Sequence, residues 1–239
     1  MKHTLLLRLK APMQSWGISS RFSIRETAKE PSKSGVIGLL CAALGISRTQ
    51  ANLENPQFAA LVKLKLSVRV LQEGVMQKDY HTAQYIAKAD GGTKETELST
   101  RWYLADADFL VGLESEDLSR LESLQITLRN PKWQLFLGRK SFVSSVPIYL
   151  AENGLQSGDG ETVLRNFEIE SEVKNQRLII EDENGNEVRQ DVPLDFATRR
   201  FSIRRVRTDF IKLNEGVEKD DGNLLDKDGS ESEMSKRAA

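Results

Sequence analysis

The chain has 239 residues, of which 39% are hydrophobic and 29% charged, which is the composition of an ordinary soluble globular protein. Its single cysteine, Cys41, excludes an internal disulfide framework, and two histidines argue against a zinc cluster. No apolar run is long enough to span a membrane, and the N-terminus does not resemble a signal peptide. We therefore expect a cytoplasmic protein with no membrane contact, no metal and no cofactor.

The 34 basic residues nearly balance the 35 acidic ones, but the two kinds are segregated along the chain. Residues 1–48 hold eight basic and two acidic residues, and residues 199–212 hold six basic and one acidic. Residues 152–195 and the segment after Leu213 carry the compensating acid. Because a phosphate chain responds to local potential, this segregation suits nucleic-acid binding. The alternative is that mixed charges only solvate the surface.

The first seventy residues predict a strand, a helix and a second strand. Residues 4–9 are a short apolar run, typical of a central strand. Residues 34–45 predict a buried helix with Ser34 as its N-cap and Gly45 as its C-terminal stop. Residues 62–70 alternate strictly, which predicts a strand with one wet, basic face.

A polar, glycine-punctuated insertion follows at about residues 72–104 and predicts a protruding hairpin. After it, residues 107–113 predict a strand, 116–124 a short amphipathic helix, and 133–137 a further strand ending at Gly138. The resulting order is the βαββαβ pattern of an α+β, ferredoxin-like fold, the skeleton of the RNA-recognition motif. We call the predicted hairpin the thumb and the remainder of residues 1–150 the palm.

The C-terminal part, residues 151–212, is acidic and predicts a β-rich extension. Residues 177–180 and 187–189 flank Asn184-Gly185, a strong hairpin signal, and residues 201–211 predict a returning strand. Residues 213–239 contain little apolar material and predict a disordered acidic tail.

Two segments near the N-terminus combine residue types that suit RNA. One follows the first strand and consists of Met13, Gln14, Ser15 and Trp16. Trp16 would either stack on a base or seal the end of the sheet. The other, Lys33 and Ser34, lies at a helix start, where free N–H groups and a cation attract phosphate, although the spacing is not that of a P-loop.

Two further candidate segments lie in the thumb and after the last predicted palm strand. The thumb offers stacking faces and adaptable hydrogen-bonding groups, and the candidates there are Tyr80, His81, Thr82, Gln84 and Arg101. Gly138 would allow a close backbone approach beside the cations Arg139 and Lys140 and the hydroxyl of Ser141. Arg204, Arg205 and Arg207 form a rival phosphate site, in which strand alternation separates Arg204 from the other two.

Five segments, in a fixed order, resemble the CasD family, the Cas-five subunits of subtype I-E CRISPR Cascade complexes; they are residues 11–17, 31–40, 79–84, 103–107 and 137–141. The resemblance implies a non-catalytic, RNA-binding subunit with a ferredoxin-like palm and a hairpin thumb. Such a subunit holds the 5′ handle of the guide RNA and contacts the backbone subunit CasC and the large subunit CasA. It meets target DNA only indirectly, through the complex.

Two other functions stay open at this stage. A metal-independent endoribonuclease would use His81, Tyr80 and Lys140, as the Cas-five proteins of a related subtype cut precursor RNA themselves. The subtype-E motif at residues 13–17 and the absence of a histidine or carboxylate pair favour the non-catalytic reading. A plain protein–protein scaffold is the third possibility.

Overall fold

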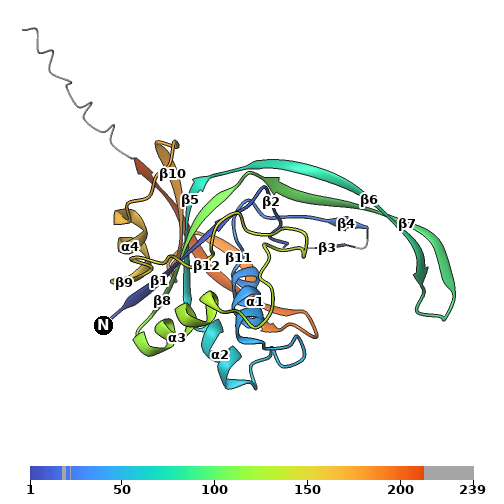
Figure 1. Cartoon of the computed structure of the whole chain (residues 1–239), viewed down its shortest axis with the longest axis horizontal. Coiled ribbons are helices and arrows are strands. Elements are labelled where there is room, and N and C mark those ends of the chain that lie inside the picture. The colour runs from blue at the N-terminus through green and yellow to red at the C-terminus, as the bar shows by residue number, and fades with distance from the viewer. Residues whose placement is uncertain (18–19, 22, 213–239) are drawn as a thin grey trace, which may run out of the picture.

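The computed structural model describes residues 1–17, 20–21 and 23–212, and the predicted acidic tail lies outside them. Its centre is a seven-stranded sheet with the lateral order β11-β12-β10-β5-β8-β1-β9, in which neighbouring strands are antiparallel (Figure 1). The seven strands are β1 His3–Lys10, β5 Lys65–Gln72, β8 Asp108–Ser115, β9 Leu155–Ser157, β10 Asn175–Glu181, β11 Glu187–Asp195 and β12 Arg200–Lys212. One continuous sheet therefore joins strands from both ends of the described chain.

Four helices cover the two faces of this sheet, which makes the fold α+β. They are α1 Lys33–Leu44, α2 Pro56–Val62, α3 Leu118–Arg129 and α4 Gly160–Asn166. Leu5, Leu7 and Leu9 pack with α1, α2 and α3 in the larger core, whereas Leu6 packs with α4 on the other face. Both faces of β1 are thus buried, which explains its continuous apolar sequence. Within the described residues, no helix is long and apolar enough to cross a membrane.

Helix α1 begins earlier than predicted. Its N-cap is Ser32, whose hydroxyl accepts a hydrogen bond from the Gly35 N–H, so the assignment of Ser34 as the cap is wrong. The predicted stop at Gly45 is confirmed, because Gly45 adopts the left-handed conformation with φ 73°.

The prediction that the strand at 62–70 has one solvent-exposed, basic face is also wrong. The strand begins only at Lys65, after α2, and both of its faces are buried as far as Leu71. Arg69 is 1% exposed because α4 covers this face. Its guanidinium donates to the carbonyls of Leu164 and Phe167. The polar residue in the alternating pattern therefore belongs to a buried hydrogen-bond network and not to a solvated face.

Residues 133–137 do not form the predicted fourth palm strand. The N–H groups of Lys132 and Trp133 donate to the carbonyls of Ala43 and Ala42, at the end of α1, so the segment crosses that helix. The free edge of β1 is instead occupied by β9 and by a single bridge from Leu7 to Tyr149.

The predicted Asn184-Gly185 hairpin is a second wrong pairing. The dipeptide does form a turn, but β10 and β11 are not neighbours, because β12 lies between them and pairs with both. The prediction of the turn is therefore right, but the prediction that the strands on either side of it pair with each other is wrong.

The thumb is confirmed as a hairpin of two long strands, β6 Val75–Ala87 and β7 Thr93–Ala105, which extends away from the palm (Figure 1). It belongs to a second, five-stranded sheet. The three short strands of that sheet are β2 Met13–Gln14, β3 Ser20–Arg21 and β4 Ile24–Arg25. Since β2 and β4 both pair with β7, the base of the thumb is fixed to the segment that follows β1.

Candidate nucleic-acid interface

The exposed strand β6 carries the predicted thumb residues. Tyr80 is 65% exposed, and His81, Thr82 and Gln84 are exposed as well. Neighbouring side chains on a strand point to opposite faces, so Tyr80, Thr82 and Gln84 share one face and His81 lies on the other. Arg101 of β7 is paired with Asp79, which places it on the face of His81.

Gln14 and Trp16 are buried and connect the palm to the thumb. The Gln14 side-chain amide, which is 0% exposed, donates to the carbonyls of Leu9 and Ala107 and accepts from the Trp16 indole. The Trp16 ring packs so closely on Gly35 that a Cβ there would lie 2.8 Å from it. This burial favours the interpretation in which Trp16 seals the end of the sheet, and the ring is not available to stack on a base.

The loop that contains Gly138 is docked against the Ser15 backbone. The Ser15 N–H donates to the Leu137 carbonyl at 3.0 Å. Gly138 has φ 101°, and a Cβ at this position would lie 1.9 Å from the Ser15 carbonyl oxygen. Only glycine permits this approach, so the predicted reason for the glycine holds, with the protein's own backbone as the partner.

Arg139 fastens the same loop to the thumb. Its guanidinium donates to the Trp102 carbonyl at 2.9 Å and lies 5.1 Å from the centre of the Phe142 ring. The Ser15 hydroxyl donates to the same Trp102 carbonyl. Two segments that are more than a hundred residues apart therefore meet at one carbonyl of β7, while Lys140 and Ser141 are exposed beside it.

Cations lie on both faces of the hairpin at this junction: Lys78 with Trp102 is on the face of Tyr80, and Arg101, next to Arg139, is on the face of His81. We name Lys78, Arg101, Trp102, Arg139 and Lys140 the thumb-base cluster. Burial lowers the pKa of Arg139, and the neighbouring charge of Arg101 lowers it further. The Lys78 amine lies 6.0 Å from the Trp102 ring centre. Across the part of the chain that the structure describes, none of the four cations forms a salt bridge. Their charge is available to a phosphate chain.

The helix start at Lys33 and Ser34 does not offer the predicted free cation. The Lys33 amine is 2.9 Å from Glu181 and its side chain is 5% exposed, while its backbone N–H donates to Asp191. Burial lowers the pKa of Lys33, and Glu181 partly restores it. The carboxylates of Glu181 and Asp191, in the C-terminal extension, thus bind the groups that the sequence predicted to bind phosphate.

The rival arginines on β12 are also held by the protein. Arg204 is 9% exposed and bonds Asp191 through two nitrogens, and Arg207 pairs with Asp182 and Glu161. Alternation does place Arg204 apart from Arg205 and Arg207, as expected. The exposed Arg205 donates to the Gly185 carbonyl.

Sequence reasoning missed Lys78 and Trp102 as parts of the site. The signal was present, because a hairpin with its turn near Gly91 places position 78 opposite position 102. The described residues contain no group of three or more His, Cys, Asp or Glu side chains arranged to hold a metal ion.

Comparison with known proteins identifies the family. The family model described as "CRISPR-associated protein (Cas_Cas5)" matches residues 4–207. The chain is 34% identical over 179 residues to "CRISPR system Cascade subunit CasD" of Escherichia coli (strain K12), a match that covers 70% of this chain and 78% of the relative.

Two solved structures share the fold. One, described as "Crystal structure of Cas protein", is 37% identical with a TM-score of 0.70, covering 89% of this chain and 98% of that one. The other, from a "CRISPR RNA-guided surveillance complex", is 30% identical with a TM-score of 0.71, covering 88% and 90%. The resemblance inferred from five short segments is thereby confirmed, and the chain belongs to the Cas5 family of CRISPR-associated proteins.

Proposed function

We propose that this protein is a non-catalytic, RNA-binding subunit of a type I-E Cascade surveillance complex that acts in antiviral defence. In this role it holds the 5′ handle of the guide RNA at the thumb base. It also joins the CasC backbone to the large subunit CasA, and meets target DNA only through the complex. The names of the relatives support membership in such a complex. The observation that carries the RNA-binding role is the unpaired charge of the thumb-base cluster.

The chemistry of this cluster suits RNA phosphate and base faces. Arg101, Arg139 and Lys140 supply cations that form no salt bridge within the described chain, although the charge of Asp79, across from Arg101 on β6, acts on Arg139. On the face of the hairpin opposite Arg101, exposed Tyr80 offers a ring for stacking, and Thr82 and Gln84 offer hydrogen bonds beside it. We propose that Met13, Ser15 and Ser141 add to this contact surface, while the buried Gln14 and Trp16 hold the segment after β1 in place.

We further propose that the palm is a ferredoxin-like unit. The segments β1-α1-β5 and β8-α3-β9 follow one another in the chain, and their strands interleave in the sheet as β9-β1-β8-β5. This arrangement supports two split βαβ units with the thumb inserted between β5 and β8. The palm would then comprise residues 1–150 together with β9, and the rest of residues 151–212 would form the extension.

The geometry disfavours the endoribonuclease alternative. Tyr80 and His81 are neighbours on β6, so their side chains leave opposite faces of the strand and do not converge on one phosphate. The opposite strand places Ser99 across from His81, and Lys140 belongs to a separate loop. A base and a cation beside one 2′-hydroxyl are therefore not assembled by these three residues.

Incubation of the purified full chain with labelled CRISPR repeat RNA in EDTA tests the proposal. We expect an intact, bound RNA whose affinity falls steeply with salt, because phosphate contacts release counterions. Cleavage of the repeat by this protein alone would establish the endoribonuclease instead. If the protein does not bind the RNA even at low salt, a plain protein–protein scaffold is the remaining function.

A further inference from the structure

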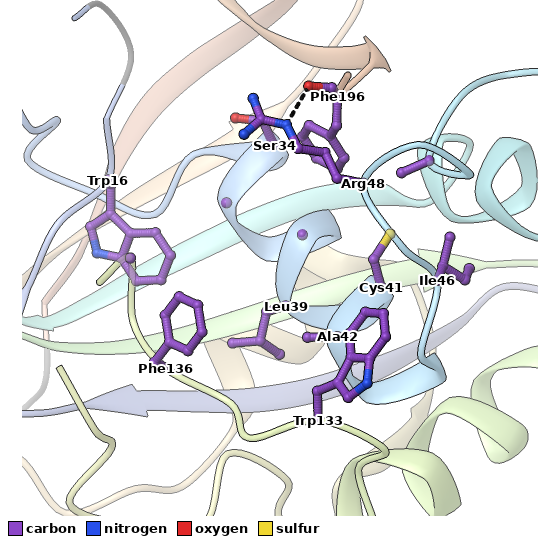
Figure 2. Close-up of a pocket in the computed structure, with 14 residues that line it drawn as sticks. Trp16, Ser34, Leu39, Cys41, Ala42, Ile46, Arg48, Trp133, Phe136 and Phe196 are labelled. Carbon is purple, nitrogen blue, oxygen red and sulfur yellow. Dashed lines mark hydrogen bonds between the residues drawn. The ribbon is translucent and has the colours of Figure 1, made fainter. Parts of the chain in front are cut away.

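A second surface of the protein, separate from the thumb, is an apolar groove along helix α1 (Figure 2). Its volume is about 400 Å³, in the range of pockets that bury a ligand or a partner's side chains. Its floor is the outer side of α1, where Gly38 and Ala42 leave space. One wall carries Trp133 and Phe136, and the facing wall carries Phe196 beside Arg48 (Figure 2).

The walls are held in place by hydrogen bonds within the protein and therefore exist without a partner. The Trp133 N–H donates to the Ala42 carbonyl, which fixes one wall to α1. On the other side, the Arg48 guanidinium donates to the Phe196 carbonyl at 2.9 Å. Even so, the Trp133 side chain is 44% exposed, although tryptophan is normally well buried. Such a ring at the mouth of a preformed apolar pocket is typical of an interaction hot spot.

The groove suits apolar side chains better than a nucleobase. Several of its polar groups are already engaged, since the Ser34 hydroxyl lies 3.4 Å from that of Ser32, Arg48 bonds the Phe196 carbonyl and the Trp16 indole donates to Gln14. A base buried here would leave its edge without hydrogen-bond partners, which is costly. Leucine-like side chains carry no such cost.

The rim of the groove is cationic. Arg48 is exposed, and the Lys132 side chain lies across Gly45, where a Cβ would be 2.1 Å from its Cδ. Neither forms a salt bridge within the described residues. An acidic partner therefore complements this rim, and a basic one is repelled.

We propose that the α1 groove docks a protein segment with two or three adjacent apolar side chains flanked by Asp or Glu, contributed by another subunit. The apolar side chains fill the space over Gly38 and Ala42 and pack on Trp133, while the acidic residues meet Arg48 and Lys132. The proposal rests on the proposed function only in that the protein works inside a multisubunit assembly. Through Gly138, which lines the groove, the docked segment reaches the loop that carries Arg139.

The test measures binding of a labelled synthetic peptide, about fifteen residues long with Leu at helical spacing between Glu, to the full chain by fluorescence anisotropy. Ala42→Leu fills the groove, and Trp133→Ala removes a wall. We expect each to weaken peptide binding about tenfold or more. Ile126→Ala removes an apolar side chain from α3 that is 65% exposed, more than Trp133, and serves as the control, with no effect expected. A peptide with Lys in place of Glu should bind the wild type about tenfold more weakly.

Three results would overturn the proposal. Equal peptide binding by Ala42→Leu, Trp133→Ala and the wild type would show that the groove is not used. Binding that appears only after removal of residues 213–239 would show that the chain's own tail occupies it. Equal loss of repeat-RNA binding and peptide binding in Ala42→Leu would make the groove a nucleic-acid site.

A separate outcome bears on the proposed function alone. If the wild type fails to bind RNA but still binds the peptide, the proposed function is refuted and the groove proposal stands.

Discussion

The thumb base and the C-terminal strands both carry arginines, but only the arginines of the C-terminal strands are surrounded by carboxylates. At the thumb base, Arg101 and Arg139 bond a hydroxyl and a carbonyl, and neither forms a salt bridge within the described residues, although Asp79 lies across from Arg101. On the C-terminal strands, carboxylates surround the arginines, as Asp191 and Glu181 surround Arg204. Density of basic residues along the chain is therefore a poor guide to an RNA site. The presence of nearby acid, brought in by the fold, decides which cations are free.

This C-terminal network, which we call the arginine network, also ties the extension to the palm. Glu30, which precedes α1, accepts from Arg177 of β10 and Arg189 of β11. Lys33 at the start of α1 pairs with Glu181 of β10. The network thus has a structural role, whereas the thumb-base cluster has the proposed binding role.

The largest effect is expected from Arg204→Ala in the arginine network. Both partners of the Arg204–Asp191 pair are under 10% exposed, so removal of the arginine takes two hydrogen bonds and a countercharge from a buried carboxylate, which keeps the hydrogen bond from the Lys33 N–H. We expect the free energy of unfolding to fall by about 3–5 kcal/mol, measured by urea denaturation. RNA affinity of the protein that remains folded should be unchanged. A stable Arg204→Ala variant that fails to bind RNA would reverse the roles of the two regions.

Gly138→Ala should have the next largest effect, because the added Cβ would overlap the Ser15 carbonyl at a φ of 101°. We expect a loss of at least about 2 kcal/mol in unfolding free energy. Gly91→Ala is the matched control: its φ is 83°, but no atom lies within 4 Å of the new Cβ, so only the strain of about 1 kcal/mol remains. Equal melting curves for the two variants would mean that the Gly138 loop is not docked on Ser15.

Arg139→Ala combined with Lys140→Ala should weaken repeat-RNA binding about tenfold at moderate salt and flatten the salt dependence by up to about two phosphate contacts. Stability should change by less than about 1 kcal/mol, because the Trp102 carbonyl loses one hydrogen bond at the surface. Lys63→Ala, which removes an exposed cation at the C-cap of α2 that forms no salt bridge within the described residues, is the control and should leave both quantities unchanged. If Arg205→Ala with Arg207→Ala abolishes binding instead, the RNA lies along β12.

The smallest expected effect is on the pH dependence of stability, and it comes from Cys41, which lines the α1 groove. Burial raises the pKa of its thiol from 9.0 to about 12. Above pH 9 the unfolded chain loses this proton and the folded chain keeps it, so stability falls as pH rises. Relative to Cys41→Ala, the wild type should lose about 1.4 kcal/mol of unfolding free energy between pH 7 and pH 10. A difference that does not vary with pH would show that the thiol is open to solvent.

The sequence by itself determined the local elements and the family. The apolar run of β1, the glycine stop of α1 and the glycine-punctuated thumb depend on side-chain and backbone preferences within a few residues. The order of five short motifs was enough to indicate the Cas-five family. The Gly138-Arg139 loop was also found from its sequence, because glycine beside cations after an apolar segment is a local signal.

Only the tertiary structure decided which strands are neighbours and which charges are free. The edge of β1 is occupied by β9 and not by residues 133–137, and β12 separates the strands that flank Asn184-Gly185. Lys33 lost its predicted phosphate role to Glu181, which lies 148 residues away in the chain. Strand pairing and ion pairing over such separations depend on what else competes for the same edge or charge, and no local pattern records that competition.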